Sequence, residues 1–351
     1  MKRAGPVRRV AACTAAGLLV ACATPAPPPI EAVTTPVAAP SVVAPESRSG
    51  RVLGRSDRFV IYQPAAGDTL RSIAARFLGS DARDWWIGEF NDIAQAEPDR
   101  PLVVPLKPVN PLGVWADQYQ TVPILCYHRF GESGGKMVMS AAAFAAQLEW
   151  LARNDYRVIP LAQLSAYLAG RQALPKRSVV ITIDDGYESV HRIALPLLRK
   201  HGFPATLFVY TDFIGAGDAL TWPQLQELSA SGLIDVQAHS KSHRNLIEQG
   251  AGDADERYRQ MLDAEARVPR EVLERRLSIP IRHYAYPYGD ANQPLLDVLA
   301  RQQYQLGLTV NPGGNAFFAQ PLMLRRTMIY GDQSLASFKL KLQTARPMGA
   351  P

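Results

Sequence analysis

The sequence predicts an α/β fold with a mainly parallel sheet, preceded by a small α+β domain. From residue 122 onward, short apolar runs alternate with amphipathic helical stretches, which is the pattern of βα units. Two adjacent carboxylates, Asp184 and Asp185, directly follow the apolar run 179–183. Because α/β barrels carry their functional residues at the carboxyl ends of the strands, we expect a functional site at this position.

Length and composition are those of an ordinary globular protein. The 351 residues suffice for more than one domain with a sizeable core, and 47% hydrophobic with 20% charged residues is a usual balance. Without residues 1–21 the formal charge falls from +6 to +2, so the basicity does not indicate a nucleic-acid partner. The charges lost belong to four basic residues, Lys2, Arg3, Arg8 and Arg9.

Residues 1–21 are predicted to be a secretory signal, because the basic start precedes an apolar run, 10–21, that is too short to span a bilayer. The run ends in LVAC, which resembles the lipobox of bacterial lipoproteins, where the cysteine, here Cys22, becomes the lipidated first residue. This resemblance implies export and a lipid anchor, and Ala23 after the cysteine favours the outer over the inner membrane. The expected location is therefore the outer membrane, on its periplasmic side or its surface. The alternative is a plain signal peptide with an incidental cysteine.

The next segment, residues 22–55, is predicted to be a Pro/Ala-rich linker. Its composition cannot bury enough apolar surface to fold and favours an extended tether. The three cysteines offer no pair for a disulfide bond. Cys13 is removed with the signal and Cys22 is predicted to be lipidated, so Cys126 has no partner. We therefore expect no disulfide framework.

Residues 56–106 predict a separate small domain of strand, helix, helix and strand. Residues 59–62 and 102–105 read as strands, and an apolar face at helical spacing follows the turn 67–69. The ordered features GDTLRSIAARF, Asn91 and LVVP resemble a LysM module, which implies binding to glycans that contain N-acetylglucosamine, such as peptidoglycan. The usual Pro-Gly before the last strand is Arg100-Pro101, and an unrelated α+β domain is the alternative.

In the larger domain, two helices can be placed between the predicted strands. Ser140 can cap one helix, and Gly202 can end another. The first bears Phe144, Leu148 and Leu151, and the second bears Ile193, Leu197 and Leu198. The predicted strands are residues 123–127, 179–183, 206–210, 234–238 and 284–286.

A pair of histidines follows another predicted strand. His239 and His243 stand four residues apart, close enough to bind one ion, although such a pair is often structural. With one carboxylate of the Asp184–Asp185 pair they provide three ligands and leave open positions for water and substrate. The other carboxylate would then be free to accept a proton.

Three stretches in order, TIDDGYESV, LTWPQLQELSASGLIDVQAHSKSH and HYAYPYG, resemble the polysaccharide deacetylases of carbohydrate esterase family 4 over about residues 120–345. The resemblance implies a distorted (β/α) barrel with fewer repeats than the eightfold one. It implies that Asp184 is the general base and that Asp185, His239 and His243 hold one divalent metal ion. Zinc is the expected ion, and cobalt, nickel or manganese also suit this mixed site.

The same resemblance assigns the third stretch to substrate binding. The backbone N–H of Tyr288 would stabilise the oxyanion, with Tyr286 and Pro287 beside it. Aromatic rings near the barrel rim could stack on sugar rings, although Trp222 also fits a packing role in a helix. These rings belong to Tyr187, Trp222, Tyr286 and Tyr288.

The sequence departs from the family at two positions. Many members carry an arginine in the third motif where this chain has Ala285, and they end with a Leu-x-His that is absent here. A subgroup that includes the exported poly-N-acetylglucosamine deacetylases instead uses an early histidine as general acid, which predicts this role for His128. Arg326 resembles that subgroup's late arginine and would orient Asp184, with the adjacent Arg325 as the alternative.

The predicted function is metal-dependent N-deacetylation of a polysaccharide that contains N-acetylhexosamine, either peptidoglycan or poly-N-acetylglucosamine. Two alternatives stay open: an esterase that removes O-acetyl groups, and a catalytically silent glycan-binding lipoprotein. The expected partners are the glycan and a membrane reached through a lipid anchor, with no nucleic acid.

Overall fold

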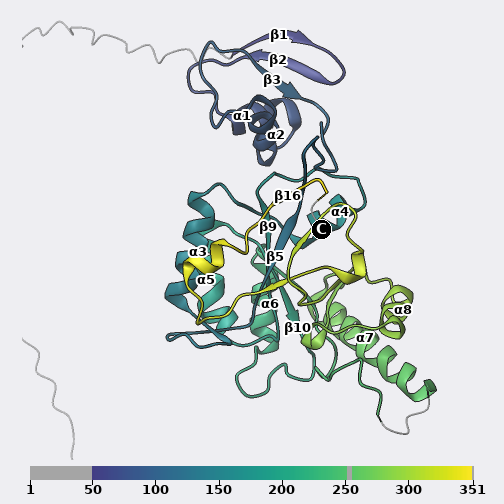
Figure 1. The fold of residues 1–351 in the computed structure, drawn as a ribbon. Helices are drawn as coiled ribbons and strands as arrows, with labels where there is room; N and C mark the ends of the chain where they lie inside the picture. The colour runs from purple at the N-terminus through teal and green to yellow at the C-terminus, as the bar shows by residue number, and fades with distance from the viewer. Residues whose placement is uncertain (1–49, 251–254, 350–351) are drawn as a thin grey trace, which may run out of the picture. The chain divides into compact units, whose positions relative to one another are not determined.

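A computed structural model describes residues 50–250 and 255–349 (Figure 1). The predicted signal peptide, Cys22 and nearly all of the predicted linker lie outside the described residues. Within the described part of the chain, no helix is both long and apolar enough to cross a membrane.

The small N-terminal domain is a three-stranded antiparallel sheet with two helices, and its strands are ordered β1-β2-β3. Its strands are β1 (Arg51–Arg55), β2 (Phe59–Gln63) and β3 (Leu102–Pro105), and its helices are α1 (Leu70–Leu78), η1 (Asp81–Arg83) and α2 (Asp84–Asn91). The prediction that the linker extends to residue 55 is therefore wrong. Strand β1 is an edge strand with no buried residue, so it has no hydrophobic pattern that would reveal it.

A helix cap, an asparagine that joins two elements and a separate hydrophobic core stabilise this domain. The Thr69 side chain accepts a hydrogen bond from Ser72 N and caps α1. Asn91 ties α2 to β3, because its Nδ2 donates to Val103 O at 2.7 Å and its Oδ1 accepts from Val103 N at 2.8 Å. The domain has its own core, made of Val60, Tyr62, Ile73, Ala74, Leu78, Ile87, Leu102 and Val104.

The larger domain is built on a curled sheet with strand order β13-β12-β11-β10-β9-β5-β14, and β8 and β15 also join it. All its pairings are parallel except that of β14 with β5. The strands are β5 (Val122–Tyr127), β8 (Arg157–Val158), β9 (Ser178–Ile183), β10 (Ala205–Val209), β11 (Ile234–Ala238), β12 (His283–Ala285), β13 (Leu306–Leu308), β14 (Gly314–Asn315) and β15 (Thr327–Met328). β5 and β9 are buried at every position, which explains their continuous apolar runs.

The segment 324–328 connects the two ends of this sheet. Leu324 N donates to Gly307 O at 2.8 Å, and Thr309 N donates to Leu324 O at 2.9 Å, which fixes the segment to β13. Thr327 and Met328 then pair with β5. The sheet therefore curls into a distorted barrel, and the predicted fold class is confirmed.

Helices cover the barrel, and α3 and α5 lie side by side, as do α7 and α8 (Figure 1). Ser140 caps α3 as expected, and Gly202 ends α5 in the left-handed conformation. The helices are α3 (Ala141–Arg153), α4 (Leu161–Leu168), η2 (Val190–Ala194), α5 (Leu195–His201), α6 (Trp222–Ala230), α7 (Asp255–Leu277), η3 (Pro287–Gly289), α8 (Gln293–Arg301), η4 (Pro321–Met323) and α9 (Leu335–Lys339). Two short pairs complete the domain: β4 (Gln118–Gln120) with β16 (Ala345–Pro347), and β6 (Arg129–Gly131) with β7 (Val138–Ser140).

Candidate active site

The predicted site residues meet at the carboxyl ends of four strands of the curled sheet. His128 follows β5, Asp184 and Asp185 follow β9, His239 follows β11, and Tyr286 follows β12. Because these strands are parallel, the residues that follow them come to the same edge of the sheet. They line a cavity of about 380 Å³.

Asp185, His239 and His243 form a compact group of potential metal ligands. Asp185 Oδ1 lies 3.6 Å from His239 Nε2 and 3.3 Å from His243 Nε2. One ligand atom from each residue lies within 4.8 Å of the others. Burial opposes ionisation of Asp185, but its hydrogen bonds with the two histidines hold its pKa well below the ordinary value. The group therefore offers one carboxylate and two imidazoles to a single ion.

The backbone around this group is unusually shaped. Asp185 has φ 76°, and Gly186 after it has φ 92°. A Cβ on Gly186 would lie 3.0 Å from Val209 Cγ1, so glycine is required by both conformation and space. Strained backbone of this kind is typical of functional sites, and here it turns the chain directly after β9.

His239 and the loop that carries His243 are each held by a further hydrogen bond. His239 Nδ1 lies 2.8 Å from Ala285 O, which fixes its tautomer and leaves Nε2 facing Asp185. The loop is bound through a buried carboxylate on α7: Glu265 accepts from Lys241 N and Ser242 N at 2.9 Å each. Glu265 therefore positions the loop before His243, and no sequence pattern singled it out.

Asp184 has a different environment from Asp185. Arg326 Nη1 donates to Asp184 Oδ1 at 2.7 Å, and both side chains are buried, with Arg326 0% exposed. Burial of Asp184 opposes ionisation, but the Arg326 charge prevails and lowers its pKa, so Asp184 carries a negative charge at neutral pH. Arg325 is exposed and does not make this contact.

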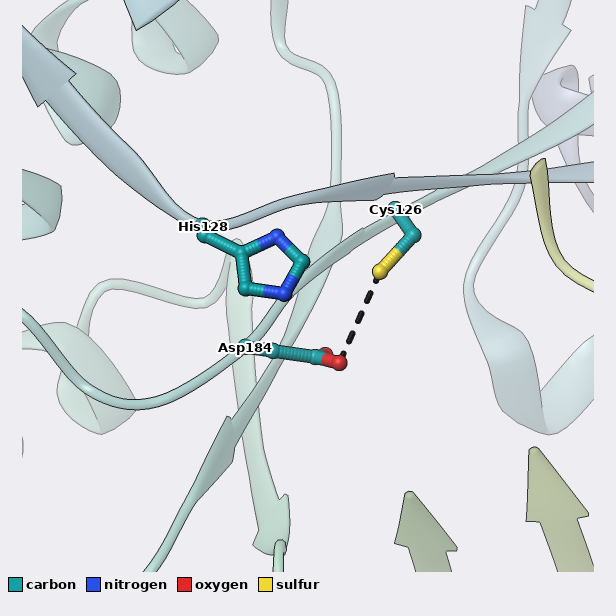
Figure 2. Close-up of side chains that lie close together, drawn as sticks. All are labelled: Cys126, His128 and Asp184. Carbon is teal, nitrogen blue, oxygen red and sulfur yellow. Dashed lines mark hydrogen bonds between the residues drawn. The ribbon is translucent and has the colours of Figure 1, made fainter. Parts of the chain in front are cut away.

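Cys126 and His128 lie beside Asp184, and Figure 2 shows the three side chains converging. Cys126 Sγ is 3.5 Å from Asp184 Oδ2. Burial raises the pKa of this thiol well above its ordinary value, so it stays protonated and donates to the carboxylate. A protonated thiol and a carboxylate paired with arginine are poor metal ligands, so a metal fits the Asp185 group better.

Burial is also the main influence on His128. It lowers the pKa of the ring below 6.5, although the charges of Asp184 and Asp185 partly oppose this. His128 is therefore neutral at pH 7 and able to accept a proton.

The aromatic residues named from the sequence lie in different environments. Tyr288 is 60% exposed and its ring lies 5.0 Å from that of His243. The proposed stacking role of Tyr286 is wrong, because this side chain is fully buried and its hydroxyl donates to Leu322 O. Trp222 packs beneath Arg276, and Tyr187 packs beneath Arg129.

Tyr288 and Pro287 lie together in the turn η3. Tyr288 is left-handed, with φ 60°, and Pro287 before it is buried. The cavity also has a second wall that sequence reasoning missed, made of Lys136, Met137, Val310, Met328 and Tyr330. Most of these residues come from loops, where no periodicity marks them. Cys126 could have been found, because it stands two residues before His128 on the same strand face.

Comparisons with known proteins agree with this geometry. The sequence profile of the polysaccharide deacetylase family matches residues 171–307. A putative polysaccharide deacetylase of Bacillus subtilis, YxkH, is 25% identical over 72% of this chain and 88% of that protein. The Escherichia coli poly-beta-1,6-N-acetyl-D-glucosamine N-deacetylase is 24% identical over 60% of this chain, but the alignment spans only 36% of that protein.

The fold is also similar to that of a solved structure. IcaB from Ammonifex degensii aligns with a TM-score of 0.57 at 28% identity, covering 64% of this chain and 97% of that one. The match to the family profile, residues 171–307, includes Asp184, Asp185, His239 and His243. The barrel domain of this chain is therefore similar to polysaccharide deacetylases in sequence and in fold.

Proposed function

We propose that this protein removes N-acetyl groups, with the help of one divalent metal ion, from a polysaccharide that contains N-acetylhexosamine. The observation that carries the proposal is the division between two adjacent carboxylates. Asp185 faces His239 and His243, whereas Asp184 is held by Arg326 and faces the same cavity. This arrangement supplies a metal site and a separate ionised base.

The residues present fit a zinc-type site. Two imidazole nitrogens and a carboxylate oxygen converge, and the Nδ1 contact of His239 with Ala285 O is the usual support for such a ligand. Cobalt, nickel or manganese would also be accepted by this ligand set. When bound, the ion lowers the pKa of water and polarises the acetamide carbonyl.

The side chains of the protein account for the proton transfers. Asp184 accepts the proton of the attacking water, and Arg326 keeps it ionised and oriented. The backbone N–H of Tyr288 donates to the carbonyl oxygen as negative charge develops there. The proton that Asp184 has accepted then passes to His128, whose neutral ring lies beside this carboxylate. His128 gives it to the leaving nitrogen, so that a free amine and acetic acid, which ionises to acetate, are formed.

The relatives and the small domain support a glycan of the cell envelope or extracellular matrix. Two relatives, from Escherichia coli and Staphylococcus aureus, are named as poly-beta-1,6-N-acetyl-D-glucosamine N-deacetylases. The resemblance of residues 56–106 to a LysM module adds a second contact with peptidoglycan or a related glycan. Lipidation at Cys22 would place the enzyme at the outer membrane, on its periplasmic side or surface.

Acetate release tests this proposal. The purified protein would be incubated with peptidoglycan and with poly-N-acetylglucosamine oligomers, with added zinc and with a chelator. We expect release from one of these glycans that the chelator abolishes. Release only from O-acetylated oligosaccharides would instead identify an esterase. A protein with one bound metal per chain and no release from any of these substrates would be a glycan-binding protein.

A further inference from the structure

A groove with two arginines lies away from the catalytic cavity. It has a volume of about 460 Å³, and its lining includes Tyr119, Phe318, Arg325 and Arg346 but none of the predicted catalytic residues. It lies where β14 pairs with Val122 and Pro123, at the start of β5, whereas His128 follows the end of that strand. A six-residue strand spans about 20 Å, so the two sites are separate.

Arg325 is held on one side of this groove. Its Nη1 donates to Pro312 O at 3.4 Å, so the side chain lies across the backbone of residues 312–313. Gly313 has φ 137°, and a Cβ there would lie 3.1 Å from Arg325 Cδ. The glycine therefore permits the close approach of this side chain.

Arg346 comes close to the same glycine, because a Cβ on Gly313 would lie 3.9 Å from Arg346 Nη2. It is the direct cross-strand neighbour of Tyr119 in the antiparallel pair of β16 and β4, so the two side chains share a face. The Tyr119 ring lies 5.5 Å from the ring of Phe318, which is 65% exposed. An exposed aromatic ring beside a second ring offers an apolar face for a ligand.

The charge of the groove is unbalanced. In the described part of the chain, neither Arg325 nor Arg346 has a carboxylate oxygen within 4.0 Å, and no Asp or Glu lines the groove. Guanidinium groups bind carboxylates and phosphates in a bidentate manner, and this preference distinguishes arginine from lysine. An anion that also presents an apolar face would therefore complement this groove in charge and in shape.

We propose that the groove of Tyr119, Phe318, Arg325 and Arg346 binds an acidic sugar, with its carboxylate or phosphate on the arginines and its ring against the aromatic residues. A lone anion would not use Phe318 or Tyr119, and a neutral sugar would not use the two charges. The site would hold part of an acidic glycan while another part is processed elsewhere. It does not depend on the deacetylase activity, because it shares no residue with the catalytic cavity.

Calorimetric titration of the whole protein with matched disaccharides tests the proposal. N-acetylglucosaminyl-N-acetylmuramic acid carries a carboxylate that N,N′-diacetylchitobiose lacks. Both would be titrated in the presence of a chelator, so that no turnover occurs. We expect the acidic disaccharide to bind more tightly, and the double variant Arg325→Gln with Arg346→Gln to lose about tenfold or more of this affinity. N-acetylglucosamine 6-phosphate would show whether phosphate replaces carboxylate.

A charge-matched double variant controls for net charge. Arg199→Gln with Arg301→Gln removes two exposed arginines outside the groove lining and should leave binding unchanged. Equal losses in the two double variants would overturn the proposal. Equal affinity for the acidic and neutral disaccharides would also overturn it, and so would inorganic phosphate binding as tightly as the acidic sugars. Absence of deacetylase activity with specific binding intact would refute only the catalytic proposal.

Discussion

Asp184 and Asp185 are adjacent in the chain but have different partners, and substitution can separate their roles. Asp184→Asn removes the proposed base while preserving side-chain shape, so turnover should fall by at least about 10²-fold. The metal content should not change, because the Asp185 group is intact. His243→Ala should lose both metal and turnover. Metal analysis with acetate release checks both variants, and loss of metal from Asp184→Asn would contradict this division.

His128 is expected to act on the leaving nitrogen. His128→Ala should lower deacetylation by about 10²-fold or more without changing metal content. A nitrophenyl acetate ester offers a sharper comparison, because its leaving group needs no proton. This ester should remain a substrate for His128→Ala but not for Asp184→Asn. Equal losses on the ester and the glycan, or near-normal deacetylation, would mean that His128 is not the acid.

Local sequence features predicted some of the site residues but not the contact between Arg326 and Asp184. The position of Asp184 and Asp185 after a predicted strand indicated a functional site, and the spacing of His239 and His243 indicated metal ligands. Nothing local indicates that an arginine 142 residues later reaches Asp184; that expectation came from resemblance. At the position in the third motif where the family resemblance implies an arginine, this chain has Ala285, whose carbonyl accepts from His239.

At the level of elements, α7 contributes to the site through Glu265. Its buried carboxylate accepts from two backbone N–H groups and, at 2.6 Å, from Ser242 Oγ, just before His243. Glu265→Gln keeps the size but loses charge and one acceptor, so zinc affinity should fall by about tenfold or more. Competition with a chelating dye measures this affinity.

The same helix provides a matched control for Glu265. Glu271→Gln makes the same chemical change at a position 54% exposed and should leave zinc affinity unchanged. A Glu265→Gln protein with normal zinc affinity and a lowered melting temperature would show that Glu265 only stabilises the fold.

Elements whose sequence pattern reflects burial were predictable, and those fixed by long-range pairing were not. The continuous apolar runs of β5 and β9 and the caps at Ser140 and Thr69 act locally, so the sequence alone reveals them. β1 was missed because an exposed edge strand has no such pattern. The segment 324–328 closes the sheet through contacts with β13 and β5, which depend on the whole fold.

At the level of the whole molecule, the proposed catalytic residues lie at the carboxyl ends of the strands, whereas the arginine groove lies at the start of β5. A long glycan that contacts both sites at once would make polymers with acidic sugars near the acetyl group the preferred substrates. Short neutral oligomers would then be poorer substrates than long acidic ones, without any difference in the catalytic residues.

The stability of the whole barrel should depend on pH through His283 in β12. Burial, followed by the charge of Arg282, lowers the pKa of His283 from 6.5 to about 4, and its Nδ1 has no hydrogen-bond partner in the described residues. The unfolded chain therefore binds the proton more readily than the folded one between these two values. The contribution of neutral His283 to the free energy of unfolding is therefore fully present above pH 6.5 and is lost as the pH falls towards 4.

Denaturant unfolding at pH 7 and pH 5 measures this contribution. The contribution of His283 to the free energy of unfolding should fall by about 2 kcal/mol between pH 7 and pH 5. His283→Gln cannot take up the proton, so it should reduce the acid loss by about this amount, even if it is less stable than the wild type at both pH values. His201→Gln, in α5, controls for removing a histidine as such. An unchanged difference between pH 7 and pH 5 in His283→Gln would mean that other groups account for the acid sensitivity of the barrel.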